Sequence, residues 1–191
     1  MTEITTLPGT IRKLWAHETD LFRDHLLRLD QGSRRLRFAH AVGDTFIRDY
    51  ASRMAEMGSI VHAYVEAGEV RAVAELRKLA DDWGTEAEVA FSVEKPLQEQ
   101  GLGGELMGLV IRAARNRGVK RLFMSCLAEN EKMQAIARKH EAELRFELGE
   151  VLGDIVPSTA DYVSILAEAV DDRVAYMLAV LDLGTRLRQV A

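Results

Sequence analysis

The middle of the chain carries a predicted strand, a glycine-rich turn and a predicted helix in direct succession. This unit constrains the fold more than any other feature. Residues 86–93 alternate as a strand does, and apolar residues recur at helical spacing over 102–117. The turn between them has no side chains at Gly101, Gly103 and Gly104. The first amides of a helix have no partner within the helix, and the helix dipole adds positive potential, so the unit is typical of a phosphate or pyrophosphate site.

The residues after the turn distinguish among phosphate ligands. A phosphate-binding loop of the nucleotide-hydrolase type needs Lys and then Ser or Thr after its last glycine, whereas Glu105 and Leu106 follow Gly104 here. A dinucleotide-binding turn needs a small residue at the position of Leu106, because helix and strand come close there. The glycines alone leave two interpretations open, an anion site of another type or a structural turn without a ligand.

The longer string around the glycines is more specific. Gln-Glu-Gln-Gly-Leu-Gly at residues 98–103 resembles the Gln/Arg-x-x-Gly-x-Gly/Ala motif of the GNAT acetyltransferases, which holds the pyrophosphate of acetyl-coenzyme A. The preceding strand, a parallel strand expected at 119–126, and Asn130 at the start of the next helix resemble that family in the same order. The resemblance is specific over residues 86–144, and it implies the GNAT fold with acetyl-coenzyme A as co-substrate.

Patterns elsewhere predict the rest of an α/β domain, which is a mixed, mostly antiparallel sheet of six to seven strands with helices on both faces. Outside the central unit, strands are expected at 10–16, 60–66, 69–79, 142–148 and 150–156, and helices at 17–30, 44–57 and after 130. The length fits one domain, assigned to residues 1–156. Residues 157–191 are expected to form a helical extension, broken near Asp171 and Asp172, that packs on the same domain or on a partner subunit. Its apolar face favours a homodimer.

Three arginines lie close together in Ser-Arg-Arg-Leu-Arg-Phe at residues 33–38. The charge pattern favours a solvated helix end or a loop. The segment also resembles one that many bacterial GNAT proteins carry between their first two helices, where it belongs to the scaffold near the acceptor side.

Composition excludes several classes of protein. The formal net charge of −5 argues against a nucleic-acid binder, since phosphate neutralisation needs concentrated Lys and Arg. No apolar run approaches membrane-spanning length, so no membrane partner is expected. The segment 1–8 lacks the features of a secretory signal, and the single cysteine, Cys126, fits a reducing compartment, so we expect a cytoplasmic protein. The five histidines show no ligand spacing, so we expect no metal.

Acetyl transfer to an amine needs a base, and two glutamates are candidates. Glu88 matches the position of a glutamate that often acts as general base in the GNAT family, and Glu86 lies on the same predicted strand face. The alternative for Glu88 is an ordinary solvent-facing strand residue. Cys126 is expected to be a buried strand residue, and His62 to be structural rather than part of an acceptor site.

The resemblance also implies contacts with the coenzyme. Phe91 and Val93 would hold pantetheine through their backbone, in a strand that bulges in the family, and an amide there would polarise the thioester carbonyl. The remaining contacts would come from the pyrophosphate cradle and the following helix: Gln98, Gly101, Gly103, Gly104 and Asn130.

One position departs from the family pattern. Ala137 stands where a tyrosine often protonates the leaving thiolate, which leaves water, Ser125, His140 or weak catalysis as alternatives. The string at 130–139 resembles bacterial GNAT domains of the protein lysine acetyltransferase type, in which this tyrosine is likewise often absent. We therefore expect direct ternary-complex transfer to a primary amine, either a protein lysine or a small amine. The alternative is a catalytically weak acyl-coenzyme A sensor or regulatory protein.

Overall fold

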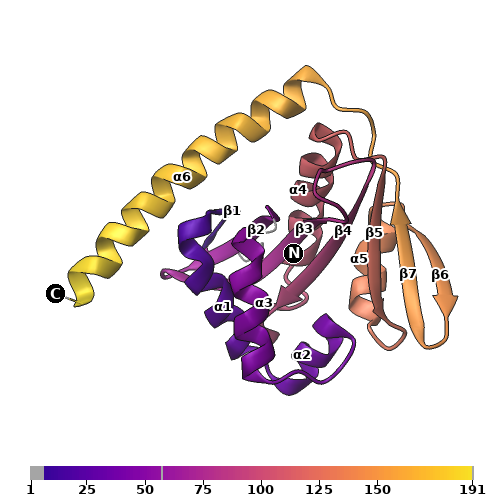
Figure 1. The fold of residues 1–191 in the computed structure, drawn as a ribbon, viewed down its shortest axis with the longest axis horizontal. Helices are drawn as coiled ribbons and strands as arrows, with labels where there is room; N and C mark the ends of the chain where they lie inside the picture. The colour runs from indigo at the N-terminus through magenta and orange to yellow at the C-terminus, as the bar shows by residue number, and fades with distance from the viewer. Residues whose placement is uncertain (1–6, 57, 191) are drawn as a thin grey trace, which may run out of the picture.

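A computed structural model describes residues 7–56 and 58–190, in which seven strands form one sheet of order β1-β2-β3-β4-β5-β7-β6 (Figure 1). The strands are β1 (Thr10–Leu14), β2 (Ile60–Glu66), β3 (Glu69–Lys78), β4 (Glu86–Val93), β5 (Arg121–Leu127), β6 (Glu143–Glu147) and β7 (Glu150–Ile155). Neighbours pair antiparallel except β4 and β5, which are parallel because a helix crosses over between them. The predicted mixed, mostly antiparallel sheet is confirmed.

Helices cover both faces of the sheet, also as predicted (Figure 1). They are α1 (Thr19–Arg28), α2 (Gln31–Phe38), α3 (Asp44–Glu56), α4 (Leu102–Asn116), α5 (Glu131–Lys139) and α6 (Tyr162–Val190), with short 3-10 turns at Ala16–Glu18 and Lys95–Leu97. Residues 1–6, which belong to the N-terminal segment considered for a secretory signal, lie outside the described residues. Residue 57, at which the helix 44–57 is predicted to end, also lies outside them.

Each face of the sheet has its own apolar core. Phe22 and Leu26 lie one turn apart on α1 and pack with Ile47 of α3 against the sheet, and none of the three has exposed surface. On the opposite face, Leu106 and Val110 of α4 are fully buried in a second cluster. Burying such a side chain contributes roughly 1.5–3 kcal/mol, so the two layers of helices hold the sheet from both sides.

Residues 31–38 form a helix of their own, α2, in which no residue is fully buried, so the expected loop is wrong. The Asp30 carboxylate accepts a hydrogen bond from the Ser33 amide at 3.1 Å and caps the helix. Ala39, with φ of 62°, ends the helix in the left-handed region.

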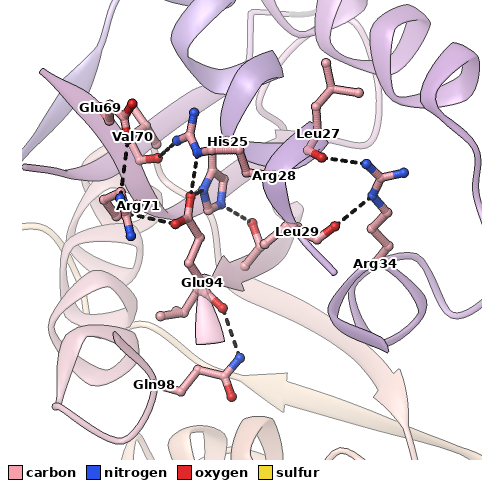
Figure 2. A network of polar contacts seen from close by, with 12 residues as sticks. His25, Leu27, Arg28, Leu29, Arg34, Glu69, Val70, Arg71, Glu94 and Gln98 are labelled. Carbon is pink, nitrogen blue, oxygen red and sulfur yellow. Dashed lines mark hydrogen bonds and ion pairs between the residues drawn. The ribbon is translucent and has the colours of Figure 1, made fainter. Parts of the chain in front are cut away.

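Two of the three arginines in this segment, Arg34 and Arg37, bind protein groups, whereas Arg35 is 48% exposed. Arg34 donates to the carbonyl oxygens of Leu27 at 2.6 Å and Leu29 at 3.0 Å, at the end of α1 (Figure 2). These carbonyls lie where a helix end lacks internal donors. The Arg37 side chain is only 5% exposed and pairs with Glu75 of β3.

The C-terminal extension is one helix, so the expected break near Asp171 and Asp172 is wrong. The Asp171 carboxylate lies 2.5 Å from the guanidinium of Arg112 on α4, and that of Asp172 lies 2.6 Å from the ammonium of Lys13 on β1. The two aspartates therefore tie α6 to the body of the domain instead of marking a helix end.

The two sides of α6 differ in exposure. Ala175 and Ala179 are buried on the side that faces β1 and α4. Large apolar side chains on the other side are exposed, among them Val163, Leu166, Val170, Val174 and Met177. Within the described ranges, no helix is long and apolar enough to cross a membrane.

Candidate functional site

The parallel pairing of β4 and β5 is short. It runs from the Glu86–Arg121 pair to the Glu88–Phe123 pair, whereas β4 continues to Val93. Beyond Glu88 the two strands part, and this edge of β4 has no further strand partner in the part of the chain that the structure describes. An unpaired strand edge presents N–H and C=O groups that an extended ligand can bind.

Two adjoining recesses lie along this open edge, and we call them together the cleft. The first, of about 270 Å³, is bounded by Glu88 and Phe91 of β4 and by Ser125 of β5. The second, of about 100 Å³, extends past Val93 to Gln98. The side chains that line both recesses are Leu36, Arg37, Phe91, Asn130 and Met133. The cleft thus leads from Glu88 to Gln98, the residue at which the glycine motif begins, with α2 forming one of its walls.

The glycine turn at the end of the cleft presents free amides. Gly101 has φ of +87°, which glycine adopts without strain, and it precedes the first turn of α4. The amides of Gly104 and Glu105 bond to the Gly101 carbonyl at 3.0 and 3.2 Å. Among the described residues, no backbone acceptor is bonded to the amides of residues 101–103. Free amides at a helix N-terminus favour an anion.

The glycines of the turn serve different purposes. A Cβ at Gly103 would lie 2.5 Å from Ile136 Cδ1 of α5, so a larger residue here would require the end of the Ile136 side chain to move. A Cβ at Gly101 would meet nothing within 4 Å, which leaves the positive φ as the reason for that glycine. Gly103 thus concerns the packing of α4 on α5, whereas Gly101 concerns the backbone conformation of the turn.

Gln98 is held between β4 and α5. Its Nε2 donates to the Val93 carbonyl at 3.0 Å, and its Oε1 accepts from Lys132 Nζ at 2.9 Å. The ammonium of Lys139 lies 3.6 Å from the position that a Cβ of Gly104 would take. Lys132 also pairs with Glu99 at 2.7 Å, so Lys139 is the lysine of α5 that adds positive charge beside the glycine turn.

Asn130 lies at the N-terminus of α5 and lines both recesses. Its Oδ1 accepts from the Met133 amide at 3.2 Å and caps the helix. Within the described ranges its Nδ2 has no bonded partner, so this group is available to a ligand in the cleft.

Of the two glutamates on β4, only Glu88 borders the cleft. Its side chain is 34% exposed and lies between the first recess and an outer groove of about 330 Å³ over β5 and β7, lined in part by Phe123 and Leu152. Glu86 instead pairs with Arg121 at 3.1 Å and lines neither hollow.

A buried polar network behind the first recess was missed in the sequence. Tyr50 Oη donates to Glu75 at 2.6 Å, and Arg37 Nη2 donates to Tyr50 Oη at 2.8 Å and pairs with Glu75. Burial, and then the charge of Glu75, raises the pKa of Tyr50 to about 12, so its hydroxyl stays protonated at neutral pH. The only signal was a carboxylate, Glu75, within the apolar run of β3.

The candidates for a leaving-group acid lie in different places. Ala137 has no exposed surface and belongs to the core. Ser125 borders the first recess and donates to Glu150 at 3.3 Å. His140 bonds to the Gly104 carbonyl at 3.1 Å and lines neither recess. Cys126 is buried as expected, and burial raises the pKa of its thiol.

The remaining sequence candidates lie away from the cleft. His62 is buried and lines neither recess. Across residues 7–56 and 58–190, no group of three or more His, Cys, Asp or Glu side chains is placed to hold a metal ion.

Residues 21–141 match the acetyltransferase (GNAT) family. Since this match spans more than half of the chain, the chain belongs to the GNAT family. No curated protein sequence matches it.

Solved structures of the same fold are numerous. The GNAT domain of S. lividans PAT is similar with a TM-score of 0.64 at 20% identity, over 78% of this chain and 90% of that one. The structure of yncA, a putative acetyltransferase from Salmonella typhimurium with its cofactor acetyl-CoA, is similar with a TM-score of 0.57 at 16% identity, over 81% of this chain and 96% of that one. A phosphinothricin acetyltransferase from Sinorhizobium meliloti in complex with AcCoA has a TM-score of 0.58 at 13% identity, over 83% of this chain and 97% of that one. At these identities the likeness establishes the GNAT fold.

Proposed function

We propose that this chain is an N-acetyltransferase that moves an acetyl group from acetyl-coenzyme A to a primary amine while both are bound. One observation carries the proposal: the open edge of β4 leads from a carboxylate, Glu88, to the free amides of a glycine turn. Membership of the GNAT family supports acetyl transfer in general. Two similar solved structures contain acetyl-coenzyme A.

The second recess and the turn fit the coenzyme. Gln98 and the free amides at Gly101 and Gly103 would bind the pyrophosphate, and Lys139 would add positive charge. Gly104, whose amide is bonded to the Gly101 carbonyl, would lie beside the bound group. The backbone of Phe91 and Val93 on the open edge would pair with the pantetheine arm, and Asn130 Nδ2 would donate to it. The pairing of β4 with β3 has no register shift, so this edge would bind pantetheine without the expected bulge.

The first recess is where the amine would react. Acetyl-coenzyme A supplies an acetyl group already activated as a thioester, so the chain needs to position it and deprotonate the acceptor. Glu88 would take the proton from the ammonium, and an amide near Phe91 would donate to the thioester carbonyl. The acceptor would reach Glu88 from the outer groove over β5 and β7, which has room for a lysine side chain or a small amine.

A thermal-shift experiment with acetyl-coenzyme A, coenzyme A and NAD tests the coenzyme site. A ligand at a hundred times its dissociation constant stabilises the fold by about 2.7 kcal/mol, which is roughly 5–10 °C for a domain of this size. We expect this shift with the two coenzyme A species and none with NAD. A coenzyme-release assay against lysine-containing proteins and small amines then identifies the acceptor. The absence of any shift would refute the proposal.

A second function is favoured by the buried Ala137. A domain without a leaving-group acid at that position fits a catalytically weak acyl-coenzyme A sensor or regulatory protein. This function predicts the same thermal shift with no coenzyme release from any acceptor, so the two experiments together separate it from the enzyme.

We also propose a cytoplasmic homodimer in which the domain 1–156 binds the substrates and α6, within the extension 157–191, pairs with its copy. Antiparallel pairing about Asp172 would place Val170 on Val174 of the other copy, which would bury the exposed apolar side of α6. Light scattering at micromolar concentration should give twice the chain mass, and Val170→Asp should give the monomer. A monomeric wild type would refute the dimer.

A further inference from the structure

A buried polar cluster joins α1 to the end of β4. His25 of α1 has no exposed surface, and its Nε2 lies 2.9 Å from Ser92 Oγ while its Nδ1 lies 3.3 Å from Glu94 Oε1 (Figure 2). Glu94 also lies 3.1 Å from Arg28 Nε and 2.7 Å from Arg71 Nε. One carboxylate thus connects α1, β3 and β4.

The hydrogen bonds of this cluster have a defined direction. Burial, as the largest effect, lowers the pKa of His25, so its ring is neutral at physiological pH. Glu94 as a carboxylate only accepts, which assigns the ring proton to Nδ1 of His25 and leaves Nε2 to accept from Ser92. The chain of donors runs from Ser92 through His25 to Glu94.

The same connectivity occurs in nucleophilic triads, but burial argues against that role here. Ser92 is 7% exposed and His25 is 0% exposed. An imidazole that neither water nor an acceptor can reach cannot pass a proton to a reacting group. The cluster therefore has a structural role, which is to hold the backbone around Ser92 and Glu94 in place.

That backbone lies between the two halves of the coenzyme site. Ser92 stands between Phe91 and Val93 on the open edge, and Glu94 is the first residue after β4. The carbonyl of Val93 accepts from Gln98, so the residues that the cluster holds are bonded directly to the first residue of the glycine motif (Figure 2).

We propose that His25, Ser92 and Glu94 are positioning residues for acetyl-coenzyme A, which hold the end of β4 where its open edge and Gln98 together receive pantetheine and pyrophosphate. The inference rests on the proposed coenzyme site. It predicts that loosening the cluster weakens coenzyme binding beyond the loss expected from stability alone.

The test compares two buried serines by isothermal titration with acetyl-coenzyme A. Ser92→Ala removes the donor to His25, whereas the control Ser164→Ala removes a similarly buried hydroxyl that donates to Asn116 at 2.7 Å, between α6 and α4. We expect similar losses in melting temperature from both. Only Ser92→Ala should raise the dissociation constant, by about five- to tenfold. Ser92→Thr, which keeps the hydroxyl, should have the dissociation constant of the wild type.

The outcomes separate this inference from the function on which it rests. If the wild type does not bind acetyl-coenzyme A, the proposed function fails and the inference with it. If the wild type binds and Ser92→Ala binds equally well, or if Ser164→Ala weakens binding as much, only the positioning role is overturned. Should Ser92→Ala not fold, Arg28→Gln gives the same comparison, because Arg28 is 35% exposed and contacts Glu94 from the surface.

Discussion

Arg77 Nη2 lies 2.7 Å from Glu88 Oε1, so the carboxylate at the mouth of the cleft is already paired with a cation. Arg77 comes from β3 and Glu88 from β4, and the two residues face each other directly across these strands. A cationic acceptor that approaches Glu88 therefore competes with a guanidinium for the same oxygen atoms. Two predictions follow from this pair, one for each partner.

Replacement of Glu88 by Gln removes the proposed base while keeping the shape of the side chain. We expect kcat to fall by about 10²–10⁴-fold, because general-base catalysis contributes that much. The dissociation constant of acetyl-coenzyme A should change less than twofold, as measured by titration. Glu86→Gln, on the same strand but outside the cleft, is the matched control and should keep wild-type turnover. Equal turnover of Glu88→Gln and wild type between pH 6 and pH 9 would exclude Glu88 as the base.

Replacement of Arg77 by Met should help a cationic acceptor to bind. The ammonium of the acceptor can then pair with Glu88 without displacing another cation, so we expect its KM to fall by about threefold, the size of a weak, partly exposed ion pair. The control is Arg112→Met, which breaks an ion pair with Asp171 far from the cleft. A KM that rises in Arg77→Met would show that Arg77 orients Glu88 rather than competes for it.

The sequence predicted those parts of the site whose conformation depends on residues that are near one another in the chain. The strand over 86–93, the turn at Gly101 and the cap at Asn130 depend on residues close together in the chain, and strand alternation and capping rules describe such segments. The resemblance to the GNAT family supplied the proposed role of Gln98 in binding pyrophosphate.

Long-range polar contacts were the part that the sequence did not reveal. Arg37 and Glu75 are 38 positions apart, and His25 and Glu94 are 69 positions apart. A charged residue is on average exposed, so a pattern of charges indicates a solvated segment unless the partner is known. This is why α2 was expected to be solvated, and why the break near Asp171 was expected where an ion pair with Arg112 stands.

A side chain at Gly103 should be tolerated better when Ile136 is shorter. Gly103→Ala brings a Cβ to 2.5 Å from Ile136 Cδ1, the end of a side chain that can turn away, and we expect it to lower the free energy of unfolding by about 0.5–1.5 kcal/mol, the cost of an unfavourable rotamer. Ile136→Val deletes that methyl group. The double variant should recover most of the loss, which urea unfolding of the four proteins in a double-mutant cycle measures. Additive losses in the double-mutant cycle would mean that the glycine is required by a contact other than the one with Ile136.

The stability of the fold should decrease in mildly acidic solution because of His62. Burial first, and then the charge of Lys13, lowers the pKa of His62 to about 4 from its ordinary value of 6.5. The unfolded chain takes up the proton as the pH falls through 6.5, whereas the folded chain does so only near pH 4. The contribution of His62 to stability is thus fully present above pH 6.5 and is lost between pH 6.5 and pH 4.

Urea unfolding at pH 7 and pH 5 measures this loss, which we expect to be about 2 kcal/mol from His62. Burial lowers the pKa of His25 as well, so its contribution has the same sign. His62→Leu puts a non-titratable apolar side chain of similar size at a site where Nδ1 has no hydrogen-bond partner, and it should remove about 2 kcal/mol of the difference in stability between the two pH values. His17→Gln, which changes an exposed histidine, should leave the difference as in the wild type. A His62→Leu variant with an unchanged pH dependence would show that His62 is protonated in the folded state as readily as in the unfolded chain.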